Sequence, residues 1–96
     1  MVTTDDLEFK KQTHGGIGAV LKTKSKVTIS IQAGEGIYSN PRENGLEPDS
    51  YISFEVALLN TKGVFITDKF INCHGDKVAG WVPREVIDTL IYQLDR

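Results

Sequence analysis

The sequence predicts an α+β fold in which an antiparallel β-sheet of about four to six strands, built from hairpins, packs against one C-terminal α-helix. Two patterns carry this prediction: apolar side chains recur at every second position over residues 17–33 and 51–59, and at every fourth position from residue 86 to residue 94. The first period is that of a half-buried strand, and the second is that of a helix with one apolar face. Neither element buries its apolar side alone, so the helix should cover one face of the sheet.

The length of 96 residues suits one domain, 1–96, because only larger chains divide into several cores. Residues 1–16 are polar apart from Leu7 and Phe9, so we expect this segment to be loosely ordered, with room for a short edge strand around these two residues. A glycine pair at residues 15–16 then forms a turn. Residues 17–33 form a hairpin whose odd-numbered side chains point inward.

The second half of the chain contains a long loop, a hairpin and the helix. Residues 34–50 break every period and are rich in Gly, Pro and Asn, which predicts a loop longer than the usual connection of about 4–6 residues. Residues 51–59 form a strand, and after a turn at 60–63 residues 64–67 return as its partner. The helix is predicted over roughly residues 83–94, with an apolar stripe of Val86, Leu90 and Leu94 flanked by Ile87 and Ile91.

Charge and composition narrow the class of protein. The net charge is −2, from 11 basic and 13 acidic residues, whereas proteins that live on nucleic acid usually carry a basic excess. Cys73 is the only cysteine, which excludes an internal disulfide. The first residues lack the basic and apolar segments of a secretory signal, and no apolar run approaches the ~20 residues needed to span a bilayer. We therefore expect a cytoplasmic protein that does not enter a membrane.

Patterns that would indicate an enzyme or a cofactor are incomplete. Cys73, His74 and Asp76 lie close together, with His14 elsewhere, but structural zinc needs about four ligands at recognisable spacing. A catalytic cysteine and histidine usually meet through the fold rather than as sequence neighbours. The glycine-rich residues 14–18 lead into a strand instead of opening a helix, as phosphate-binding loops do. We expect no enzymatic activity, no cofactor and no metal.

The long loop holds the residues that best fit a protein contact. Tyr38, Arg42 and Glu43 lie together in it, and Tyr and Arg are enriched at binding hot spots. Trp81, just before the helix, is the fourth candidate for partner binding. The alternative is structural: Tyr38 would fix the loop to the core, and Trp81 would be an aromatic residue at the edge of the core.

A lysine cluster provides the second hypothesis. Lys22, Lys24 and Lys26 alternate at the tip of the first hairpin, so an outward lysine face could meet the phosphates of a nucleic acid or a nucleotide. The alternative is a solvated face that discourages edge-to-edge aggregation. The strand edges also leave room for a homodimer.

Four stretches resemble small phage, prophage and plasmid proteins to which no activity is assigned: Ser30–Ala33, Tyr38–Arg42, Glu55–Leu58 and Val78–Pro83. The resemblance spans roughly residues 27–94. A cysteine often stands in those proteins where this chain has Ser39, so a thiol-dependent role at that position does not carry over. The resemblance implies an accessory protein of a mobile element, a class that often works by binding and blocking a host factor. We therefore expect a non-enzymatic protein-binding module that inhibits or modulates a host or phage protein, such as part of a defence system.

Overall fold

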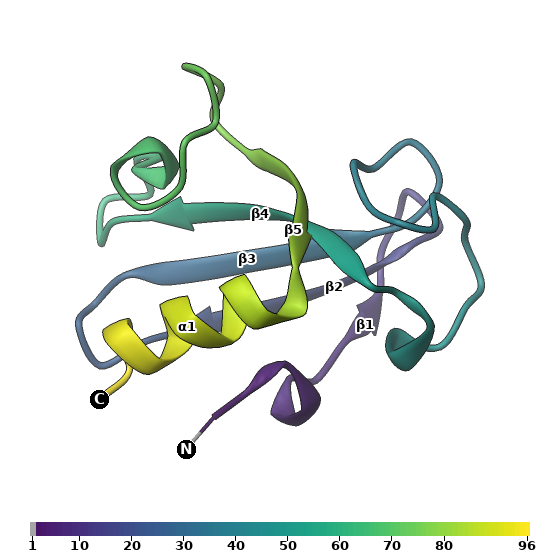
Figure 1. Ribbon diagram of the computed structural model, residues 1–96, viewed down its shortest axis with the longest axis horizontal. Helices are drawn as coiled ribbons and strands as arrows, with labels where there is room; N and C mark the ends of the chain where they lie inside the picture. Colours follow the sequence, from purple (N-terminus) through teal and green to yellow (C-terminus); the bar gives the residue numbers. More distant parts are fainter. Residues whose placement is uncertain (1) are drawn as a thin grey trace.

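Residues 2–96 are described by the computed structural model, in which five strands form one antiparallel sheet and one helix follows them (Figure 1). The strand order is that of the sequence, so each strand pairs with its neighbours along the chain. The predicted fold class is confirmed. The strands are β1 (Lys10–Lys11), β2 (Ile17–Lys22), β3 (Thr28–Ala33), β4 (Ser53–Leu59) and β5 (Ala79–Pro83); the helix is α1 (Arg84–Leu94); and three 3₁₀ turns are η1 (Thr4–Asp6), η2 (Pro48–Ser50) and η3 (Thr67–Lys69).

The core lies between one face of the sheet and α1, which lies over that face in front of β2 and β3 (Figure 1). The hairpin of β2 and β3 pairs from Ile17 with Ala33 to Lys22 with Thr28, and its odd-numbered side chains point inward as predicted. Side chains alternate along a strand, so the remaining residues form the opposite face, here called the open face. The fully buried core side chains include Ile29, Ile31 and Ala33 of β3, Phe54, Val56 and Leu58 of β4, and Ile87 of α1.

The helix is rotated slightly from the predicted stripe. Its buried residues are Ile87, Leu90 and Ile91, whereas Val86 is exposed and faces the segment around Phe70. The predicted stripe and the buried face share Leu90. In the structure the face centred on Ile87 and Ile91 packs against the sheet, and Val86 lies outside it.

The predicted partner strand at residues 64–67 is reduced to one bridge between Leu59 and Phe65. The turn at residues 60–63 forms as predicted, but the Thr67 hydroxyl then accepts the backbone N–H of Leu58 at 2.9 Å and donates to the carbonyl of Lys77 at 2.7 Å. This side chain replaces a ladder bond and turns the chain into η3. β5 therefore fills the edge beside the first half of β4.

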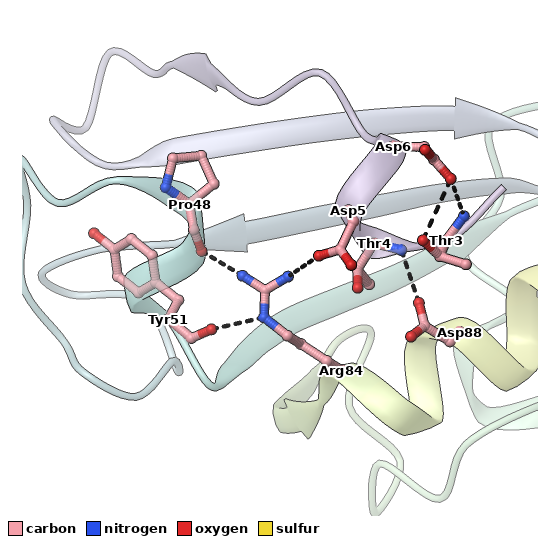
Figure 2. Close-up of polar contacts among 8 residues, drawn as sticks. All are labelled: Thr3, Thr4, Asp5, Asp6, Pro48, Tyr51, Arg84 and Asp88. Carbon is pink, nitrogen blue, oxygen red and sulfur yellow. Dashed lines mark hydrogen bonds and ion pairs between the residues drawn. The ribbon is translucent and has the colours of Figure 1, made fainter.

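The N-terminal segment packs on the core instead of lying loose. Thr4 is buried, and its N–H donates to the Asp88 carboxylate of α1 at 2.7 Å (Figure 2). Phe9 stacks on Phe54 with ring centroids 5.5 Å apart. The short edge strand forms just after Phe9, as β1 at Lys10–Lys11, so the start of the chain closes one side of the core.

Arg84 ties this segment to the rest of the fold (Figure 2). Its Nε donates to the carbonyl of Tyr51 at 2.9 Å, and a second guanidinium nitrogen donates to the carbonyl of Pro48. The guanidinium carbon lies 4.9 Å from the centroid of the Phe54 ring, and the Asp5 carboxylate lies 3.8 Å from the third nitrogen. We call Arg84 and these contacts the Arg84 clamp; it joins η1, η2, β4 and α1.

Candidate functional site

The long loop between β3 and β4 is held to the sheet by its own hydrogen bonds. The hydroxyl of Ser39 accepts the N–H of Gly34 at 3.1 Å and donates to the carbonyl of Pro41 at 3.0 Å. Asn40 forms an isolated bridge with Ser53 at the start of β4. Ser39 is buried, so the loop turns around a satisfied polar group rather than an apolar one. This arrangement places Tyr38 beside β5.

Three of the four predicted partner-binding residues meet in one surface group. The Tyr38 and Trp81 rings stack with centroids 4.9 Å apart, and the guanidinium carbon of Arg42 lies 5.4 Å from the centroid of the Tyr38 ring. The N–H of Trp81 donates to the carbonyl of Tyr38 at 2.8 Å, and Arg42 Nε donates to the carbonyl of Ile37 at 3.1 Å. Tyr38 remains 43% exposed and Trp81 53% exposed. We call Arg42, Tyr38 and Trp81 the aromatic stack.

Trp81 reaches this position through a β-bulge. Between the pairs Phe54–Val82 and Val56–Ala79, β4 contributes one residue and β5 contributes two, Gly80 and Trp81. Trp81 has a φ of 52°, a left-handed conformation that costs a residue with a Cβ about 1–2 kcal/mol. Gly80 is required by contact, because a Cβ there would lie 2.8 Å from the Cβ of Tyr38. The bulge thus turns a large apolar side chain out of the strand at a cost in backbone energy.

Glu55 stands at the foot of the aromatic stack, opposite the bulge. Its carboxylate accepts the N–H of Tyr38 at 3.0 Å. Glu55 also lines a shallow hollow of about 230 Å³ on the open face, with Ser30, Gln32, Ala57, Leu59, Phe65 and Val78. Period-two patterning assigns this face to solvent, so the sequence prediction did not identify the hollow. The one signal in the sequence is that two of its lining residues, Phe65 and Val78, are apolar.

Glu43, the fourth predicted contact residue, takes a different part. Its side chain is exposed, and among residues 2–96 no hydrogen bond or ion pair joins its carboxylate to the aromatic stack. Its carbonyl instead accepts the hydroxyl of Tyr51, which is fully buried. Burial raises the pKa of the Tyr51 phenol above its ordinary value, and the nearby Glu43 carboxylate adds to that rise.

The lysine cluster is divided by the structure. Lys22 and Lys26 line one hollow beside the turn that follows β4. Lys24 lies next to the C-terminus of α1, where its N–H donates to the Asp95 carboxylate at 2.9 Å. The three lysines are all exposed, but they do not form one track across the surface.

Cys73 sits in surroundings that disfavour ionisation of its thiol. The residue is buried, and its Sγ donates to the carbonyl of Asp76 at 2.9 Å. Burial, with the carboxylate of Asp68 beside it, raises the pKa of the Cys73 thiol, which disfavours the nucleophilic thiolate. His74 is exposed on the adjoining turn. Within residues 2–96 no three His, Cys, Asp or Glu side chains gather in a way that could hold a metal ion.

Comparison with protein-family models, with curated proteins and with solved structures finds no match. The resemblance to small phage, prophage and plasmid proteins therefore stays a prediction. In the described part of the chain, no helix is long and apolar enough to cross a membrane. The geometry of the site is what carries the functional argument.

Proposed function

We propose that this chain is a non-enzymatic protein-binding module that contacts its partner through the aromatic stack. The observation that carries the proposal is Trp81, which is half-exposed and held at a φ of 52° by a bulge. Backbone strain of this kind persists only where the surrounding structure enforces it, and it gathers at functional sites. In the free protein the bulge leaves the apolar ring of Trp81 exposed to water. A bound partner that covers the ring would gain the free energy of burying that apolar surface.

The composition of the aromatic stack supports the same conclusion. Trp, Tyr and Arg are the residue types most enriched among binding hot spots. Each side chain of the stack is already held by a neighbour, Trp81 on Tyr38 and Arg42 on both Tyr38 and the loop backbone. A prearranged surface loses less side-chain entropy on binding than three mobile side chains would.

The role we propose for this contact is to inhibit or modulate a host or phage protein by covering part of it. Covering a surface requires no reacting group. The edge at β1 is a poor alternative surface, because a two-residue strand of lysines discourages the addition of another strand.

The test is affinity capture from the cells that make the protein, followed by titration of the captured partner. Wild type, Tyr38→Ala, Arg42→Ala and Trp81→Ala are compared, each after its melting temperature has been measured. The matched control is Tyr92→Ala, because Tyr92 is 51% exposed and carries Arg96 over its ring at 5.3 Å, which repeats the Arg42–Tyr38 pairing on α1.

The proposal expects the stack variants to weaken binding by about tenfold or more while the Tyr92 variant binds like the wild type. A partner that is released by nuclease treatment would contradict it, since the contact would then run through nucleic acid. An equal loss in the Tyr92 variant would also contradict it, because any exposed aromatic residue would then serve.

A further inference from the structure

A second hollow lies at the opposite end of the open face from the aromatic stack, where the turn between β2 and β3 meets the turn after β4. Its volume of about 510 Å³ lies within the range of about 300–1,000 Å³ usual for small-molecule sites. The row formed by Lys22, Thr28 and Leu59 crosses three paired strands at its floor. The lining residues are Lys22, Thr23, Lys26, Thr28, Leu59, Asn60, Thr61 and Gly63.

The charge of this hollow is one-sided. Lys22 and Lys26 line it, and no acidic residue does. Among residues 2–96 the one ion pair within 4.0 Å joins Arg84 to Asp5, so neither lysine has a carboxylate partner. The two lysines that line the hollow carry like charges, and an anion bound there would lower their mutual repulsion.

Three of the uncharged side chains of the hollow, Asn60, Thr28 and Thr61, can also donate hydrogen bonds, whereas the hydroxyl of Thr23 already donates to the carbonyl of Val27 at 2.7 Å. The side-chain oxygen of Asn60 already accepts the N–H groups of Lys62 at 2.9 Å and Val64 at 3.0 Å, which leaves its NH₂ group as the free half of the amide. The hydroxyls of Thr28 and Thr61 make no hydrogen bond to the described residues, and each can donate. Phosphate oxygens accept hydrogen bonds from all of these groups.

We propose that this hollow binds a small phosphate-bearing molecule, with the phosphate between Lys22 and Lys26 and the rest of the ligand over Leu59. A single phosphate ligand fits better than a nucleic-acid strand for two reasons. Lys24 lies apart from the hollow, beside Asp95, so the lysines do not trace a backbone. No aromatic side chain lines the hollow, and strand-binding grooves use such side chains to stack bases. The site is separate from the aromatic stack and does not depend on the proposed partner contact.

The test is an NMR titration of the full chain with inorganic pyrophosphate, followed through the backbone amides. We expect saturable shifts confined to residues 22–28 and 59–63. The double substitution Lys22→Gln with Lys26→Gln should weaken binding by at least about tenfold. The matched control, Lys10→Gln with Lys24→Gln, removes the same charge from other exposed lysines and should stay within about twofold of the wild type.

Three results would overturn the proposal. One is the absence of saturable shifts at these residues up to about 10 mM pyrophosphate. Another is an equal loss of affinity in the control variant, which would assign the effect to overall charge. The third is tighter binding of a single-stranded oligonucleotide than of pyrophosphate, weakened by Lys24→Gln and falling steeply with salt, which would assign the lysines to nucleic acid. The four lysines are exposed, so folding is expected to survive each substitution, and melting curves check this.

Discussion

Arg84 and Arg42 use the same chemistry in two regions of the molecule. Each places its guanidinium over an aromatic ring, at 4.9 Å from Phe54 and 5.4 Å from Tyr38. Each donates its Nε to a main-chain carbonyl, at 2.9 Å and 3.1 Å. The surroundings differ: the Arg84 side chain is 21% exposed and is joined to η2 and η1, whereas Arg42 is exposed at the loop surface.

The difference shows that exposure, more than the type of contact, decides how much each arginine contributes to the stability of the fold. Removing Arg84 leaves the partly buried carbonyl of Tyr51 without a donor, at a cost of about 1–3 kcal/mol, whereas the carbonyl of Pro48 keeps the N–H of Tyr51 at 3.3 Å. Removing Arg42 leaves a carbonyl that water can reach. The Arg84 clamp therefore supports the fold, and the contacts of Arg42 add less to stability.

The largest effect expected is that of Arg84→Ala. It should lower the free energy of unfolding by about 1–3 kcal/mol, since the substitution leaves the Tyr51 carbonyl without a donor and removes the guanidinium from the Phe54 ring. Chemical denaturation measures this directly. Arg42→Ala is the matched control and should change stability by less than about 0.5 kcal/mol. Equal losses in the two variants would remove the distinction between the regions.

Asp88→Ala tests the second contact that holds the N-terminal segment to α1. The Asp88 carboxylate accepts the N–H of the buried Thr4, so its loss should cost about 1–2 kcal/mol. Asp95→Ala removes a similar bond, from Asp95 to the N–H of Lys24, at an exposed position. That control should cost less than about 0.5 kcal/mol, because water replaces the bond. A larger loss for Asp95 than for Asp88 would show that the N-terminal segment adds little to stability.

Backbone strain in the aromatic stack predicts a smaller effect with a definite sign. Trp81 has a φ of 52°, so Trp81→Gly should be more stable than Trp81→Ala by about 0.5–1 kcal/mol. Glycine avoids the left-handed strain of about 1–2 kcal/mol, but it loses more conformational entropy on folding, which offsets part of that gain. At the exposed helical residue Val86 the order should reverse, with Ala more stable than Gly by about 1 kcal/mol. Urea unfolding of the four variants gives both differences. The same order at both positions would contradict the strain.

The smallest effect at neutral pH concerns Tyr51, whose raised pKa acts only in alkali. An unfolded tyrosine loses its proton near pH 10, and the folded phenol holds it to higher pH. This contribution to stability is therefore present below about pH 10 and is lost as the pH rises through the folded pKa. Tyr51→Phe should lack that part of the alkaline loss, and Tyr92→Phe should retain it. Parallel pH profiles for wild type and Tyr51→Phe would contradict the assignment.

Local patterns predicted much of the fold. The inward faces of the β2–β3 hairpin and of β4 follow from alternation, since a strand has a fixed period wherever it pairs. The partner of β4 could not be read in this way. Residues 64–67 have the composition of a strand, but the single hydroxyl of Thr67 takes the ladder bond and leaves the edge to β5.

The aromatic stack was predicted in its members but not in its assembly. Tyr38 and Trp81 meet because an extra residue in β5 turns the tryptophan outward and Gly80 lets the tyrosine approach. A glycine before Trp81 that interrupts the alternation of residues 78–82 is the one sequence signal of the bulge. For the lysines the members of the cluster were predicted as one face, but the structure separates them. The alternation of a strand does not extend into the turn between β2 and β3, where Lys24 lies.

The order of the strands has a kinetic consequence. Each strand pairs with its sequence neighbour, so each pairing in the sheet closes one connection, and the long ones are residues 34–52 and 60–78. The bond between Thr4 and Asp88 spans 84 residues and closes the molecule from end to end. Contacts of such separation are expected to form after the transition state, so the bond between Thr4 and Asp88 should affect how slowly the native protein opens rather than how quickly it folds.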